Sequence, residues 1–316
     1  MKRSVLSLLL LGTLAACNDK PPGQLEPIPR PPGYKDPAQA EAPKSAPTPA
    51  QDPNKVVLRW KLAVGAPMAF RLEGAPDSDG GPLKAVFVLY RPEKGDRVLR
   101  IAQQTPKAPL EQGIVSDRGF VLDGLGEVDR NLATLLMELP KDPVGVGDTW
   151  TLGADLVNME PLGQGFLAKK SERRNTVKLS SLNAEGDEQV ATIQYDVSEL
   201  VSGSLQPGAR LPEGAGETAP LKPAPEKGKK GKGKKQAQAS EEKPKSTSEI
   251  VSEVTFKGSG EFLVKAGRWR SWKGTLTSKT QGYSPAPGKS PAQVPPGTLK
   301  LQLSAMDAVP AELQQL

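Results

Sequence analysis

The chain of 316 residues contains no His and a single Cys, and aromatic residues make up only 4% of it. Without His, a Ser-His-Asp or Cys-His catalytic site and an imidazole metal site are excluded. One Cys cannot form an intramolecular disulfide or a thiolate zinc site. Neither a Gly-x-Ser-x-Gly motif nor a marked pair of carboxylates is present. We therefore expect a protein that is not an enzyme and that holds no cofactor and no metal.

Glycine and proline, in contrast, are abundant, with 32 residues of each. Together they make up well over the roughly 12% that is usual in proteins. Chains of this composition cannot bury enough apolar surface to order their whole length. The composition predicts long disordered segments around a smaller folded part.

The N-terminus has the layout of a bacterial export signal. Two basic residues, Lys2 and Arg3, precede an apolar run, and Leu14-Ala15-Ala16-Cys17 follows. Such a layout over residues 1–16 is typical of a signal peptide. Residues 4–16 are too short to cross a membrane, which takes about 20 apolar residues. An ordinary signal peptide with an incidental cysteine is the alternative to a lipid anchor.

Leu14-Ala15-Ala16-Cys17 resembles the lipobox of bacterial lipoproteins. This resemblance implies cleavage before Cys17 and acylation of that residue. Two or more acyl chains hold a protein firmly on a membrane, whereas one chain does so only marginally. Asn18, where an enteric inner-membrane signal has Asp, favours the outer membrane. We expect an envelope protein anchored through Cys17, on either the periplasmic or the surface side.

Two low-complexity segments interrupt the mature chain. Residues 17–53 are rich in Pro and predict an extended tether. Residues 206–248 form a disordered insertion with nine Lys and three Glu between 222 and 245. That net +6 equals the formal charge of the whole chain, and Lys2 and Arg3 add two more, so the remainder sums to −2. The basic character therefore belongs to the insertion.

The lysine run of the insertion is a candidate contact for anionic surfaces. Clustered lysines attract phosphate groups without specificity and in a salt-dependent way. In an exported protein the anions are lipid headgroups, lipopolysaccharide or acidic wall polymers, and nucleic acid is excluded by compartment. A solvated insertion without a partner is the alternative. The run consists of Lys227, Lys229, Lys230, Lys232, Lys234 and Lys235.

Residues 54–310, apart from the insertion, predict a mainly β domain. Short stretches of alternating apolar and polar residues, separated by glycine turns, favour an antiparallel curved sheet, barrel-like or a sandwich. The first two stretches predict a hairpin. We expect the segments on both sides of the insertion to share one sheet, with two separate domains as the alternative. The predicted strands are 56–64, 68–72, 85–91, 97–103, 119–123, 150–152, 176–182, 190–201, 250–256, 262–264, 268–279 and 299–303.

One segment has helical periodicity instead. Apolar residues recur at three- and four-residue spacing over 125–139, from Leu125 to Leu139, and Pro140 follows. Proline disfavours helical geometry in the residue before it. The pattern predicts a single amphipathic helix that packs on a face of the sheet.

Three glycine-containing motifs of the predicted β domain are Pro143-Val144-Gly145-Val146-Gly147-Asp148-Thr149-Trp150, Gly258-Ser259-Gly260-Glu261-Phe262, and Gly267-Arg268-Trp269 ahead of Gly274-Thr275-Leu276. The first resembles the signature of an uncharacterised family of exported β-rich bacterial lipoproteins, and the other two look similar to the second half of that family. This resemblance implies compartment and fold but no activity.

Two features inside these motifs are candidate sites. Asp148 is either a functional carboxylate or the capping residue of a tight turn. Trp269 and Trp272, three apart on a predicted strand, are expected to face opposite sides. One then lies in the core, and the other either packs on the sheet or sits at a rim beside Arg268, Arg270 and Lys273, where it suits a membrane or a carbohydrate.

Three further motifs are interpreted as chance matches. Residues 163–168 match a loose dinucleotide pattern outside any βαβ unit. Residues 77–81 resemble the start of a calcium loop without its later ligands, and predict a hairpin turn. Ser240 and Lys243 have nucleophile-pair spacing but lie in low-complexity sequence.

These features lead to one functional hypothesis and two alternatives. The chain is expected to be a membrane-anchored, non-enzymatic lipoprotein that serves as a binding or envelope-structural module. One alternative is a carrier that holds lipid or another hydrophobic ligand in a cavity of the sheet. The other is a hydrolase that uses two carboxylates.

Overall fold

The computed structural model describes residue 52 and residues 54–77, 82–104, 109–206, 249–283 and 290–313. They all belong to one compact unit, Gln51–Leu316. Cys17, the Pro-rich segment apart from residue 52, the lysine run and the Ser240–Lys243 pair lie outside the described residues.

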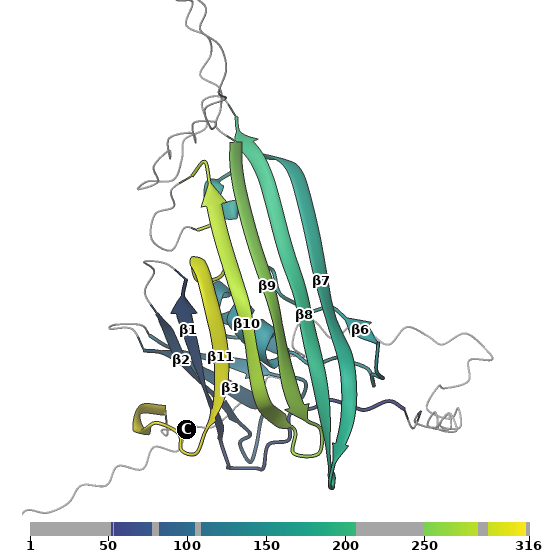
Figure 1. Ribbon diagram of the computed structural model, residues 1–316. Coiled ribbons are helices and arrows are strands. Elements are labelled where there is room, and N and C mark those ends of the chain that lie inside the picture. The colour runs from purple at the N-terminus through teal and green to yellow at the C-terminus, as the bar shows by residue number, and fades with distance from the viewer. Residues whose placement is uncertain are drawn as a thin grey trace, which may run out of the picture. The chain divides into compact units, whose positions relative to one another are not determined.

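Eleven strands form a single antiparallel sheet in the described part of the chain (Figure 1). Its order is β5-β4-β3-β2-β1-β11-β10-β9-β8-β7-β6, so β5 and β6 are the edges and the sheet is not closed into a barrel. The mainly β, antiparallel fold is confirmed. The strands are β1 (Met68–Pro76), β2 (Leu83–Tyr90), β3 (Arg97–Gln103), β4 (Leu110–Val115), β5 (Val121–Asp123), β6 (Thr149–Trp150), β7 (Phe166–Glu185), β8 (Glu188–Leu205), β9 (Glu249–Leu263), β10 (Arg268–Gln281) and β11 (Gly297–Met306).

The strands on both sides of residues 207–248 are direct neighbours. β8 ends and β9 begins at this segment, and the two pair over their length, with Val197 opposite Phe256. Both arms of the chain therefore share one sheet, as the sequence predicts.

Residues 56–64 are not a strand, and the predicted hairpin is wrong. The segment is extended and buries alternate residues, including Leu58 and Trp60. Its backbone bonds go elsewhere: Trp60 N–H donates to Asp117 O, and Lys61 N–H to Gly267 O. β1 pairs instead with β2 and β11. Alternation shows which side chains are buried, but it does not identify the partner strand.

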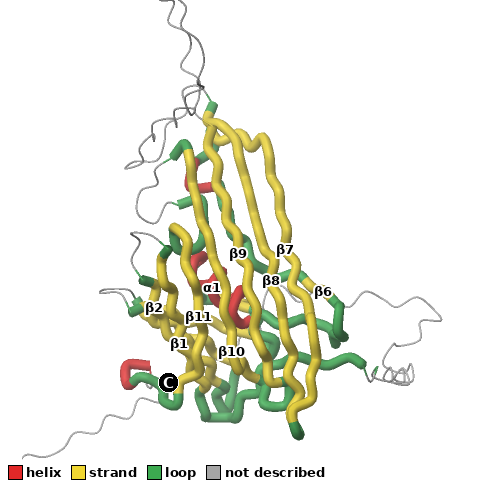
Figure 2. The backbone as a smooth tube through the Cα atoms, viewed as in Figure 1, coloured by secondary structure: helices red, strands yellow, loops and turns green. Residues whose placement is uncertain are grey.

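The predicted helix is confirmed as α1 (Glu127–Met137). Two carboxylates in its first turn, Glu127 and Asp129, complement the positive end of the helix dipole. Leu132, Leu135 and Leu136 are buried on one side of α1. They join the main hydrophobic core. α1 lies against one face of the sheet, called the inner face here (Figure 2).

Glycines make room for aromatic rings on the inner face. Phe256 and Trp272 stack with ring centroids 5.2 Å apart. A Cβ atom on Gly260 would lie 2.9 Å from both the Trp269 and the Trp272 rings. Gly258 and Gly260 therefore lie within β9 and do not end it, which corrects the predicted break between 256 and 262.

Trp269 and Trp272 are both buried, at 3% and 1% exposure, so the prediction that they face opposite sides is wrong. The register of β10 against β9 shifts between Trp269 and Ser271, which inserts Arg270 as an extra residue. A bulge of one residue reverses the alternation of the side chains that follow it. The indole N–H of Trp269 donates to Leu136 O at 2.7 Å, which ties β10 to α1.

Candidate functional site

A groove of about 880 Å³ lies beside the β6 edge of the sheet. One wall is the chain that leaves α1, and the other is β6 with the residues after it. The groove overlaps the Pro143–Trp150 segment that carries the family resemblance. Its lining consists of Arg118, Glu138, Pro140, Lys141, Asp142, Pro143, Val144, Gly147, Asp148, Thr149, Trp150, Thr151, Leu152 and Gly153.

A buried carboxylate holds the two walls together. The Glu138 side chain is 3% exposed, and its Oε1 atom lies 2.8 Å from Arg118 Nη1. Its Oε2 atom accepts a hydrogen bond of 2.7 Å from the Gly153 N–H. Burial raises the pKa of Glu138, while the Gly153 bond and the Arg118 charge oppose this shift. Glu138 therefore links the end of α1 to the strand side of the groove.

Arg118 is fixed on three sides. Besides Glu138, its guanidinium donates to Leu139 O at 3.2 Å and lies 4.5 Å from the centre of the Phe120 ring. Both contacts orient the planar group. Arg118 forms a rigid part of the groove lining.

A second buried carboxylate acts in the same way further along the chain. Glu199 Oε2 accepts from the Leu156 N–H at 2.9 Å, and burial raises the pKa of Glu199. Arg173 donates to Ala154 O nearby. These contacts tie residues 154–156 to the inner face of β7 and β8.

Asp148 caps the turn before β6, as the turn interpretation of this residue predicts. Its Oδ2 atom accepts from the Gly145 N–H at 2.9 Å and lies 3.1 Å from Lys55 Nζ. The Gly145 hydrogen bond and then Lys55 hold the pKa of Asp148 below its ordinary value. Gly147 has a φ of 95°, a conformation that glycine adopts at no steric cost.

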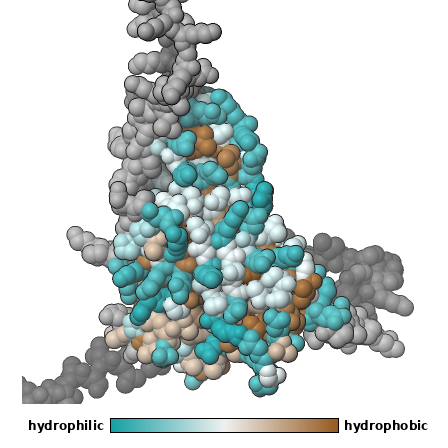
Figure 3. Space-filling view, viewed as in Figure 1, coloured by the Kyte–Doolittle hydropathy of each residue, from teal (hydrophilic) through white to brown (hydrophobic). Residues whose placement is uncertain are grey.

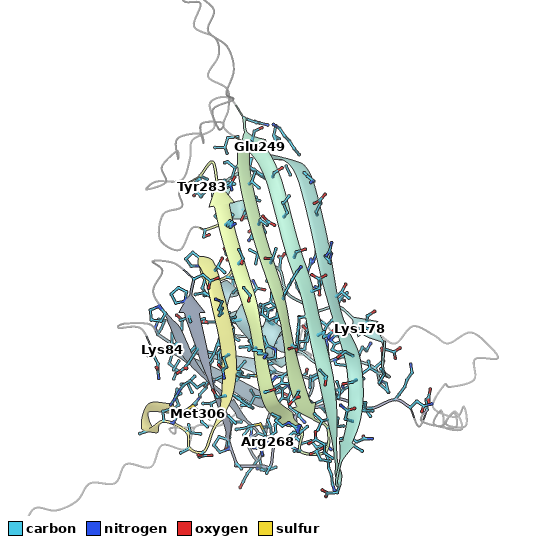
Figure 4. All side chains as sticks on the ribbon, viewed as in Figure 1. Lys84, Lys178, Glu249, Arg268, Tyr283 and Met306 are labelled. Carbon is cyan, nitrogen blue, oxygen red and sulfur yellow. The ribbon has the colours of Figure 1, made fainter. Side chains whose placement is uncertain are left out.

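Within the described part of the sheet, the backbone of β6 is paired on one side only. Trp150 is opposite Val177 of β7, and Thr149 is opposite Lys178, which is labelled in Figure 4. The Asn175 side chain extends this pairing by two hydrogen bonds to the backbone of Leu152. Its Nδ2 atom donates to Leu152 O at 2.8 Å, and its Oδ1 atom accepts from the Leu152 N–H at 2.9 Å.

Along an extended chain, the backbone N–H and C=O groups of successive residues point alternately to opposite sides. The backbone of Leu152 faces β7, and the Gly153 N–H faces Glu138 on the opposite side. The N–H and C=O groups of Thr149 and Thr151 therefore face the same side as Gly153, toward the groove. For Thr151 these groups have no partner among the described residues.

The remaining predicted sites do not assemble into a centre. Gly163 follows the short 3₁₀ helix η2 (Glu160–Leu162) and leads into β7, so no helix follows the dinucleotide-like pattern. Asp77 pairs with Lys300 at 2.6 Å, and residues 78–81 lie outside the described part. Within the described ranges, no group of three or more His, Cys, Asp or Glu side chains is placed to hold a metal ion.

The candidate site also depends on three residues that the sequence does not single out, namely Glu138, Arg118 and Asn175. Their roles depend on contacts 15 to 23 residues away along the chain. The available signal is a charged residue at the apolar end of a helix, directly before Leu139 and Pro140. That position places Glu138 among buried neighbours.

Comparison of the chain with family models, curated proteins and solved structures finds no match in any of the three. Among the residues with described positions, no helix has the length and apolar character needed to cross a membrane.

Proposed function

We propose that this protein is a lipid-anchored, non-enzymatic binding module of the bacterial cell envelope, and that its groove holds an extended polypeptide segment. The anchor is Cys17 of the lipobox-like sequence, with the outer membrane as its location. The Pro-rich segment 17–53 serves as the tether between the lipid and the sheet domain.

The single observation that supports the binding mode is the one-sided pairing of β6. Unpaired N–H and C=O groups at a sheet edge accept an additional strand, and grooves beside such edges add side-chain contacts. Thr149 and Thr151 offer these groups toward the groove. A peptide laid there extends the sheet by one short strand.

The neighbouring edge of β7 is less suited to the same role. It carries Lys169, Lys170 and Arg174, and its pairing with β8 is irregular at two places, between Ala168 and Lys170 and between Leu179 and Ser181. Charges and bulges protect edge strands against added partners. The groove is therefore the preferred point of strand addition.

The anchor is tested by fractionation of cells that produce the full chain or its Cys17→Ala variant. The wild type should remain in the membrane fraction, and the variant should be released from it. If the variant stays in the membrane fraction, the lipoprotein proposal is wrong.

The binding mode is tested with Thr151→Pro and its matched control Thr151→Ala. Proline removes the N–H that faces the groove, whereas alanine keeps it. A phage-displayed library of random dodecapeptides, selected on the wild type, supplies the probe. A selected peptide should bind the alanine variant like the wild type and the proline variant about fivefold more weakly, the effect of one hydrogen bond. Equal binding by both variants, or no enrichment of any peptide, would contradict strand addition.

A further inference from the structure

The face of the sheet that points away from α1, called the outer face here, carries an ordered array of polar side chains. Across β1, β11, β10, β9, β8 and β7, three neighbouring cross-strand rows contain no large apolar residue. Figure 3 shows this face, with its central part white and blue-green. The rows are Glu73-Gln302-Lys273-Ser259-Gln194-Lys178, Ala75-Lys300-Thr275-Lys257-Asp196-Thr176, and Thr298-Thr277-Thr255-Ser198-Arg174.

Three lysines surround Thr275 in the middle of this array. Lys257 on β9 and Lys300 on β11 both lie directly opposite Thr275. Their Cβ atoms are therefore about 4.5–5.5 Å from that of Thr275. Lys273 lies on the same side of β10, about 7 Å along the strand. The long side chains of all three can converge above the Thr275 hydroxyl.

The surface is hollowed at this position. A depression of about 490 Å³ is lined by the three lysines, by Gln302, and by small residues that include Ala75 and Ser259. Short side chains in the centre and long ones around them give it its shape. It is large enough for a sugar unit with an acidic substituent.

The positive charge at the depression is only partly balanced. Lys300 Nζ lies 2.6 Å from Asp77 Oδ1. Asp196, opposite Lys257, is paired with Arg174 at 3.0 Å. Lys257 and Lys273 have no ion pair within the described part of the chain. Two lysines are thus available to an anion.

We propose that the lysine-ringed depression binds an acidic polysaccharide, a partner distinct from the peptide of the groove. Ammonium groups match the carboxylates or phosphates of such a polymer, and the hydroxyl and amide rows match its sugar hydroxyls. An anionic membrane needs the same charge, but membrane-surface contacts also use large apolar or aromatic side chains. The three rows contain none, which favours the polysaccharide.

The test compares the full chain with the triple variant Lys257→Gln/Lys273→Gln/Lys300→Gln. The control Lys61→Gln/Lys94→Gln/Lys265→Gln removes the same charge from exposed lysines outside the depression. Both keep the lysine run 227–235. The probes are polygalacturonate and phosphorylated dextran, with neutral dextran and phosphatidylglycerol vesicles as comparisons. Binding is measured by calorimetry at 0.15 M salt, and unchanged thermal unfolding shows that the variants are folded.

The triple variant should bind at least one acidic polymer about tenfold more weakly, because it loses three exposed charge contacts. The control should bind like the wild type, and neutral dextran should not bind. The relative loss for the two acidic polymers distinguishes carboxylate from phosphate. The proposal is overturned by equal binding of the triple variant and the control, by binding of vesicles but of neither acidic polymer, or by no binding of either polymer to the wild type.

Discussion

The two faces of the central strands differ in almost every respect. Inward residues of β9 and β10 include Phe256, Phe262 and Trp272, all nearly inaccessible, with glycines between them. Outward residues on the same strands, such as Lys257 and Thr275, are exposed. The inner face of these strands therefore holds the main core of the domain, and their outer face is exposed.

The largest expected effect comes from Trp60, which covers the inner face. Its ring packs edge-on against Phe70 and Phe262, and its N–H donates to Met137 O at 2.7 Å. Trp60→Ala should lower the free energy of unfolding by about 3–5 kcal/mol, as for other buried aromatic residues. Urea unfolding measures this value. A loss below about 1 kcal/mol would show that the inner face is not the main source of stability.

Gly260→Ala should have a smaller effect on the same face. The added methyl group would meet the Trp269 and Trp272 rings at 2.9 Å, and both rings are buried. Overpacking of this kind costs about 1–3 kcal/mol. The control is Ser259→Ala on the outer face, expected to change stability by less than about 0.5 kcal/mol. Similar losses for the two variants would remove the distinction between the faces.

The pH dependence of stability separates buried from exposed carboxyls. Burial raises the pKa of Glu138 above its ordinary value of 4.5. The stabilisation by its protonation is complete below pH 4.5 and is lost as the pH rises through the raised pKa. Between pH 4.5 and pH 7, the unfolding free energy of the Glu138→Gln variant should therefore decline less than that of the wild type. Urea unfolding at both pH values checks this, and an unchanged decline would contradict it.

Asp148 should behave in the opposite way. Its pKa lies below the ordinary value of 3.8, so its stabilisation is present above pH 3.8 and is lost as the pH falls through the lowered pKa. Asp148→Asn should weaken the loss of stability in acid. Thermal unfolding between pH 2 and pH 5 follows this difference, and a stronger acid sensitivity of the variant would contradict the turn-capping role.

The smallest effect is expected for Lys257→Gln on the outer face. Lys257 is exposed and lacks an ion pair among the described residues. Its replacement should change the unfolding free energy by less than about 0.5 kcal/mol in urea. A larger loss would mean that this lysine supports the fold and is not reserved for a ligand.

Local periodicity in the sequence predicts the elements whose pattern is uninterrupted. β3 has the predicted bounds, and α1 lies within the predicted range. β4 is not predicted, because Gly113 occupies an inward position where an apolar residue would complete the alternation. A Cβ atom there would lie 2.7 Å from the Leu125 side chain. The requirement for glycine comes from a residue that only the folded chain brings close.

The candidate site likewise combines local contacts, which the sequence predicts, with contacts between distant segments, which it does not predict. The Gly147-Asp148 turn is predictable because its hydrogen bond to Gly145 is local. The Glu138 contact with Gly153 and the free side of β6 depend on which strands pair, and the sequence pattern does not contain this information. The bulge at Arg270 likewise places both Trp269 and Trp272 inside.

The proposed function requires that acyl chains on Cys17 hold the protein at the membrane and that its partners bind to the outside of a packed domain. Mass spectrometry of the protein purified from its native membrane, under denaturing and then native conditions, tests this most directly. We predict an acylated Cys17 and the same mass under both conditions. An unmodified Cys17, or a lipid that is lost on denaturation as a hydrophobic carrier would require, would contradict the account.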